Sequence, residues 1–152
     1  MYTSYRQQYV FGFQPFELDD VSASSSLFLG TEVGGKSTAA GCVPIDLKAD
    51  KQMKYLKMRL DIKVLEPLAG SGATGTITFF TCGDNAGAAD TSNAVELFSL
   101  PVSTAAAIAS STAPWFEITV PSNCKQYIYA EVAVGSTAFT GGKLLIQMNP
   151  NL

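Results

Sequence analysis

Apolar and polar positions alternate along the stretch from Tyr55 to Leu65, YLKMRLDIKVL. Its even-numbered positions hold apolar side chains, and the odd-numbered positions between them hold charged ones. A strand gathers every second residue on one face, whereas a helix would scatter these apolar residues around its circumference. The pattern therefore predicts a strand with a buried even face and an odd face that lies in solvent or at an interface.

Further β-branched, aromatic or alternating runs, each bounded by turn residues, predict the other strands. Pro67 and Pro101 are expected to end two of them, because proline lacks the N–H that a sheet ladder needs. The strands at 55–65 and 75–83 are expected to form a hairpin with a glycine-rich tip. The predicted strands are 26–30, 43–47, 55–65, 75–83, 95–100, 115–120, 125–134 and 144–148.

About eight strands without a convincing helix predict an all-β fold, an antiparallel β-sandwich. A jelly roll is the expected arrangement, with the immunoglobulin sandwich as the alternative. Cys82, Trp115 and Cys124 imitate the immunoglobulin cysteine pair with its tryptophan, but Trp115 lies too close to Cys124 for the usual strand placement. The expected organisation is a single jelly-roll domain over residues 17–152, preceded by residues 1–16 as an N-terminal arm or a first strand.

The first sixteen residues carry six aromatic side chains, which would be costly to leave in water. One interpretation is a first strand whose rings join the protein's own core. The other is an arm that buries its rings on a partner, because exposed aromatic residues anchor interfaces. The arm interpretation predicts a contact role for Tyr2, Tyr5, Arg6, Tyr9, Phe11, Phe13 and Phe16.

Composition narrows the function classes. Charged residues make up only 15% of the chain, the net charge is −3 and no run of Lys or Arg occurs, so we expect no nucleic-acid partner. No apolar run has the length of a membrane span and the N-terminus lacks the features of a secretory signal, so we expect neither a membrane partner nor export. Three widely spaced cysteines then predict free thiols in a reducing compartment.

The chain contains no histidine, which removes the commonest general base, the commonest metal ligand and every nucleophile paired with histidine. We therefore expect no enzyme, no catalytic residue, no cofactor and no metal. A pair of carboxylates for glycoside chemistry is the remaining enzymatic alternative, because its geometry is invisible in sequence. The candidates for such a pair are Glu66, Asp84, Glu96, Glu117 and Glu131.

Two polar loops resemble ligand sites only in part. Asp84, Asn85 and Asp90 offer oxygen ligands for calcium, but their spacing matches no calcium loop and a closing bidentate glutamate is missing. A plain turn is the preferred interpretation. The glycines of VGGK at 33–36 lack the rest of a phosphate-binding loop.

Four C-terminal phrases resemble the tailed-phage capsid cement, or decoration, proteins. In that family an acidic turn follows a strand with a Thr-rich end, and a Leu-Pro segment, a Lys/Arg-Tyr strand and a closing F-T-x-G-K strand come after it. The phrases are GTITFFTCGDNA from Gly75, ELFSLPV at 96–102, WFEITVPSNCKQYIYAEVAV at 115–134 and AFTGGKLLIQM at 138–148. The first 50 residues match poorly, so no contact residue is transferred from the family to that region.

The resemblance implies a jelly-roll virion protein of a bacteriophage, located on the capsid exterior and assembled in the host cytoplasm. It implies that the protein binds and clamps neighbouring major capsid subunits, without an active site, and forms a homo-oligomer, a dimer or a trimer. The alternative is a carbohydrate-binding or host-adhesion β-sandwich module of a tail or fibre. Exposure of Trp115, Tyr127 and Tyr129 in one concave patch would favour that alternative.

Overall fold

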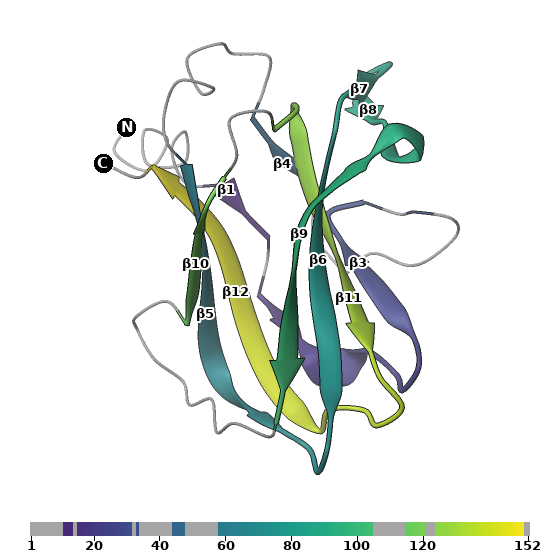
Figure 1. Ribbon diagram of the computed structural model, residues 1–152, viewed down its shortest axis with the longest axis vertical. Coiled ribbons are helices and arrows are strands. Elements are labelled where there is room, and N and C mark those ends of the chain that lie inside the picture. The colour runs from purple at the N-terminus through teal and green to yellow at the C-terminus, as the bar shows by residue number, and fades with distance from the viewer. Residues whose placement is uncertain are drawn as a thin grey trace.

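Two antiparallel β-sheets face each other in the computed structural model, which describes residues 11–13, 15–31, 33, 44–47, 58–104, 115–120 and 124–150 (Figure 1). The expected all-β antiparallel sandwich is confirmed. The described helical residues form only two short 3₁₀ turns, η1 (Leu18–Asp20) and η2 (Thr91–Asn93). Burial of the facing sheet surfaces therefore supplies the core.

The first sheet is built around two long strands, β5 and β12, which pair along most of their length. In order across the sheet, β10 pairs with β5, β5 with β12, and β12 with both β1 and β2. The bounds are β1 (Phe11–Gly12), β2 (Phe16–Glu17), β5 (Met58–Ala69), β10 (Phe116–Thr119) and β12 (Gly141–Pro150).

The second sheet is built around β6 and β11. In order, β9 pairs with β6, β6 with β11, and β11 with both β3 and β4. A separate two-stranded hairpin, β7 with β8, follows β6 at one end of the sandwich (Figure 1). The bounds are β3 (Ser26–Leu29), β4 (Ile45–Asp46), β6 (Thr74–Cys82), β7 (Asp84–Asn85), β8 (Ala88–Ala89), β9 (Val95–Ser103) and β11 (Tyr127–Val134).

Strands from the first half of the chain pair with strands from the second half in a nested order. When β1 and β2 are taken as one strand, β3 and β4 as the next, and the small hairpin is set aside, the first strand pairs with the last. The second then pairs with the seventh, the third with the sixth, and the fourth with the fifth. The chain thus resembles one long hairpin that folds over itself into two sheets.

The alternating pattern of β5 sets which face is buried. Leu60, Ile62 and Val64 lie in the core, as predicted from their even positions. The prediction is wrong for Asp61, which lies on the odd face yet is only 2% exposed. Its carboxylate is shielded because Arg59, on the same face, donates to it from two nitrogens, at 2.6 Å and 3.0 Å.

The expected hairpin between the strands at 55–65 and 75–83 is wrong, because β5 and β6 belong to different sheets. Alternation fixes the face that a strand buries but does not choose its neighbour. The connection turns at Gly70 (φ +132°) and Gly72 (φ +72°), a left-handed backbone that glycine adopts without strain. It carries the chain from one sheet to the other instead of back along the same sheet.

The two prolines expected to end strands lie inside them instead. Pro67 lies in β5 opposite an irregularity in the pairing with β12, and beyond the residues that pair with β10. Pro101 lies in β9, which pairs with β6 on one side only. Proline is tolerated at bulges and at sheet edges, where no ladder partner needs its N–H.

The start of the described chain joins the sandwich. Phe13 and Phe16 are buried at 3% and 4% exposure, and the Phe13 N–H donates to the Ile146 carbonyl at 3.0 Å. A Cβ on Gly30 would lie 3.1 Å from the Phe13 ring, so this glycine gives the ring its room. These two phenylalanines therefore behave as the first-strand interpretation requires.

Candidate functional site

The residues predicted to contact a partner divide into three groups. Phe13 and Phe16 belong to the protein's own core, so the expectation that they anchor a partner is wrong for these two. For Phe11 the structure gives only its backbone pairing opposite Met148. The other predicted contact residues, Tyr2, Tyr5, Arg6 and Tyr9, lie outside the described residues.

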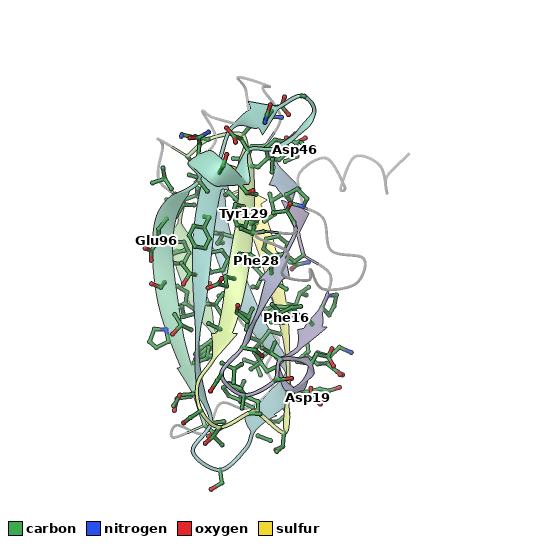
Figure 2. All side chains as sticks on the ribbon, turned by 90° about the vertical axis from the view of Figure 1, so that its right-hand side faces the viewer. Phe16, Asp19, Phe28, Asp46, Glu96 and Tyr129 are labelled. Atoms are coloured by element: carbon green, nitrogen blue, oxygen red, sulfur yellow. The ribbon has the colours of Figure 1, made fainter. Side chains whose placement is uncertain are left out.

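A second apolar cluster lies on the outer face of the second sheet, separate from the main core. Its centre is the ring of Tyr129, which stacks on Phe80 at a centroid distance of 5.2 Å and contacts Phe28 at 6.1 Å. Figure 2 shows Phe28 and Tyr129 side by side on neighbouring strands, with Glu96 further along the same face. Tyr129 is only 2% exposed, and this burial raises its pKa to about 12.

The loop after β6 is held by hydrogen bonds from its own chain. Asp84 accepts from the Tyr127 hydroxyl at 2.9 Å and from the Gly87 N–H at 3.2 Å. The first of these bonds is the main cause that raises the pKa of Tyr127 to about 12. Asp90 accepts from Asn93 and Ser92, which lower the pKa of its carboxyl. Both carboxylates thus brace turns, in agreement with the preferred interpretation of this loop.

The three aromatic residues that would favour a sugar site do not form one patch. Tyr127 and Tyr129 are buried in the outer cluster, whereas Trp115 is half-buried and packs against the main core. A sugar ring needs an exposed aromatic face, and buried rings offer none. The condition set for the carbohydrate-binding alternative is therefore not met.

Hydroxyl groups dominate the outer face of the second sheet beyond the aromatic cluster. Thr76 and Thr78 of β6 lie beside Pro101 and Ser99 of β9. On the other flank, a hollow of about 580 Å³ is lined largely by small side chains and contains one carboxylate. The SASSS run at 22–26 signalled this surface, although sequence alone did not place it. The residues lining the hollow are Ser24, Ser25, Ser26, Glu131, Ala133, Val134, Gly135 and Ser136.

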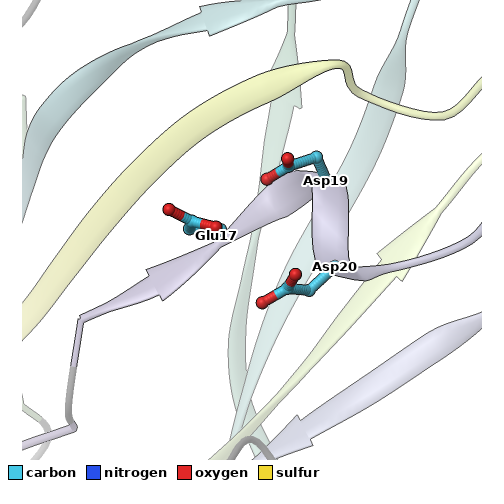
Figure 3. A group of neighbouring side chains, drawn as sticks. All are labelled: Glu17, Asp19 and Asp20. Atoms are coloured by element: carbon cyan, nitrogen blue, oxygen red, sulfur yellow. The ribbon is translucent and has the colours of Figure 1, made fainter.

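An acidic group that the sequence did not single out lies at the end of β2. Carboxylate oxygens of Glu17, Asp19 and Asp20 lie within 4.8 Å of one another (Figure 3). Asp19 and Asp20 are exposed, and Lys143 of β12 pairs opposite Glu17. Such groups are common on protein surfaces, so this geometry assigns no ion to the site.

The two described cysteines are free and buried. The Cys124 thiol lies 3.5 Å from the Thr81 hydroxyl, which donates to the Tyr127 carbonyl and accepts from the Lys125 N–H. Burial is the main cause that raises the pKa of Cys82. A raised pKa keeps the thiol protonated and unreactive. The prediction of free thiols is confirmed for these two, and Cys42 lies outside the described residues.

Comparisons with protein-family models, curated proteins and solved structures return no match for this chain. Within the described part of the chain, no helix is both long and apolar enough to cross a membrane. The strand order and the chemistry of the surface are therefore the features of this chain that bear on its function.

Proposed function

We propose that the protein is a jelly-roll structural component of a virion, a capsid cement or decoration protein of a bacteriophage. It binds the outside of the icosahedral shell and clamps neighbouring major capsid subunits. The observation that carries the proposal is the nested strand order, in which the first strand pairs with the last and each inner pair follows. Eight strands wound in this way are typical of viral capsid and lectin domains.

The fold alone does not distinguish a capsid protein from a lectin, so the chemistry of the surface must help to distinguish them. The outer face of the second sheet offers threonine and serine hydroxyls, and its aromatic rings are buried except for Phe80, which is half-buried. A surface of hydroxyl groups suits modest contacts with another protein better than stacking on a sugar ring. Repetition of such contacts over a shell replaces high affinity at one site.

The predicted contact residues refine the proposal. Tyr2, Tyr5, Arg6 and Tyr9 precede the first described residue of the sandwich, and Phe11 lies at its start. Because Phe13 and Phe16 already fill the protein's own core, the contact segment is shorter than residues 1–16. We assign shell contact to residues 1–11, with the tyrosines as anchors and Arg6 in the polar rim.

Sedimentation with empty shells of the cognate major capsid protein tests this function. The intact chain is expected to travel with the shells, and an electron density map of the decorated particle is expected to place it on the outer surface. A chain without residues 1–10 is expected to remain folded and to stay unbound. The finer comparison replaces Tyr2, Tyr5 and Tyr9 by Ser, with a control that replaces Thr3, Ser4 and Gln7 by Ala.

The control is expected to bind as the intact chain does. Failure of the intact chain to bind any shell, combined with retention on immobilised glycans, would favour the adhesion module instead. Equal binding by the tyrosine variant and its control would move the attachment surface from the N-terminal segment to the sheet face or the loops.

A further inference from the structure

Among the described strands, β9 lies at one edge of the second sheet. It pairs with β6 on one side, and no described strand pairs with its other side. In Figure 2 the strand that carries Glu96 runs along the margin of the molecule. With nine residues it is the longest of the described edge strands, because β3 and β10 have four residues each and β1, β2 and β4 have two. An open edge of this length is a template for another strand.

A hydrogen bond just beyond the strand shows which backbone groups face this edge. The Thr104 N–H donates to the Ala73 carbonyl at 3.1 Å, so residue 104 faces β6. Backbone groups in an antiparallel strand alternate between its two sides. Val102 and Leu100 therefore also face β6, whereas Ser99 and Pro101 face outward. The absence of an N–H on Pro101 then costs the β6 ladder nothing.

The composition of the edge suits a neighbour of the same kind. Native edges are commonly protected by lysine or proline; β9 has no lysine, its single charged side chain is Glu96, and Pro101 lacks a donor only at its own position. The Glu96 carboxylate accepts from the Ser99 hydroxyl at 3.0 Å. Val95 is the more exposed of the two large apolar residues found on the described surface, at 53%. The irregular pairing between Phe79 and Phe80 leaves the segment from 98 to 103 as the regular part of the edge.

We propose that β9 pairs antiparallel with β9 of a second copy, across a two-fold axis at Ser99. Each Ser99 N–H then donates to the Ser99 carbonyl of the partner subunit, and the two sheets become one continuous sheet. An axis at Ser99 sets each Pro101 opposite Leu97 of the partner subunit, where one donor is missing, whereas an axis at Pro101 would set two prolines opposite each other, where both donors are missing; the axis is therefore placed at Ser99. Such a contact is isologous, because the same residues are used on both sides.

The charges on β9 and the area that two paired strands bury determine how strongly two copies are expected to associate. An axis at Ser99 separates the two Glu96 residues by six residue steps, about 20 Å along the strands. That distance exceeds the screening length of about 8 Å at physiological ionic strength, so the two carboxylates do not oppose pairing. A single pair of edge strands buries less than the roughly 1,200 Å² of a stable interface. The dimer is therefore weak, with a dissociation constant between about 10 μM and 1 mM.

Two substitutions of Ser99 distinguish the contribution of its backbone N–H from that of its side chain. Ser99→Pro removes the outward N–H and leaves the bonds to β6, whereas Ser99→Ala keeps the N–H and removes the hydroxyl. In sedimentation equilibrium, Ser99→Pro is expected to raise the dissociation constant about tenfold or more through two lost hydrogen bonds. Ser99→Ala is expected to stay within about threefold of the unaltered chain, because the interface needs only its backbone.

Amide hydrogen exchange of the unaltered protein gives a second test that needs no folded variant. The Ser99 amide is expected to exchange more slowly at high than at low protein concentration, while the Leu100 amide, bonded to β6, stays protected at both. A protein that remains monomeric up to about 1 mM overturns the proposal. So does equal dimerisation of the two variants, or a Ser99 amide that exchanges freely at every concentration. Loss of shell binding by Ser99→Pro in a chain that never dimerises would assign the edge to a strand of the shell instead.

Discussion

Arg59 and Asp61 form a two-point ion pair on the outward face of β5, with nitrogen-to-oxygen distances of 2.6 Å and 3.0 Å. The carboxylate is 2% exposed and the Arg59 side chain 33%. The hydrogen bond to Asp61 is the main cause that raises the pKa of Arg59, so the guanidinium stays charged throughout the working range. A buried carboxylate is tolerated here because its counter-charge is built into the same strand.

Substitution of either partner is expected to lower the unfolding midpoint in urea. Asp61→Asn leaves Arg59 without its anion, and Arg59→Leu leaves a carboxylate with little access to water. The double variant is expected to lose less than the sum of the single losses, because the pair acts as a unit. Strictly additive losses in this cycle would show that the two side chains contribute independently.

Leu60 is fully buried, whereas Leu65, on the same strand, is 39% exposed. Leu60→Ala is expected to lower the free energy of unfolding by about 2 to 5 kcal/mol, through lost burial and the cavity that remains. Leu65→Ala, the matched control, is expected to change it by about 0.5 kcal/mol or less. Urea titration followed by tryptophan fluorescence measures both, and similar losses at the two positions would contradict the face assignment of β5.

The sequence predicted faces well because the period of two depends only on local geometry. Leu60, Ile62 and Val64 of β5 follow it, and β11 turns Ile128 inward and Tyr129 outward in the same way. Burial of an outward residue depends on distant contacts and could not be predicted. Tyr129 is covered partly by Phe28, a residue about one hundred positions earlier in the chain.

The prediction of which strands pair was less successful than the prediction of which faces are buried. A short connection after β5 indicated a hairpin with β6, yet β5 pairs with β12 at the far end of the chain. Local sequence does not encode that choice, because the partner strand lies at the other end of the chain. The same limit applies to Asp61, since alternation placed it outward and did not foresee its burial beside Arg59.

Tyr127 is expected to make stability depend on alkaline pH. Its pKa is raised from 10.0 to about 12 in the folded protein, so folding holds this proton more tightly than the unfolded chain does. The stability that protonated Tyr127 gives to the folded state is fully present below about pH 10 and is lost as the pH rises towards 12. Urea unfolding at about pH 9 and about pH 11 is expected to show the loss, while tyrosinate absorbance follows the titration itself.

Variants at Asp84 test the cause of that shift. Asp84→Ala removes the hydrogen-bond acceptor and is expected to move the pKa of Tyr127 back towards its ordinary value. Asp84→Asn keeps an acceptor and is expected to move it less, because the hydrogen bond outweighs the charge. Glu117→Ala, on the other sheet, serves as the control. An unchanged titration in Asp84→Ala would exclude the hydrogen bond as the main cause.

Thiol titration is expected to find three free groups per chain in denatured, non-reduced protein. In the native protein Cys82 and Cys124 are expected to react slowly, because both are buried and the pKa of Cys82 is raised. Replacement of either cysteine by Ala is expected to remove one slow phase of the thiol reaction, which assigns that phase to the residue. A count of one thiol would mean that two of the three cysteines are bridged, against the reducing compartment that their spacing indicates.

Two deletions are expected to separate the N-terminal contact segment from the first strand. Removal of residues 1–10 keeps Phe13, so the melt is expected to stay cooperative. Removal of residues 1–13 also takes away the ring beneath Gly30 and the N–H bond to Ile146. The added loss is expected to be comparable to that of Phe13→Ala in the full chain, about 3 to 5 kcal/mol. Phe13→Leu is the control, because a similar apolar volume should restore most of the difference. If the two deletions melt alike, Phe13 contributes little to the core, and the boundary of the sandwich lies further along the chain.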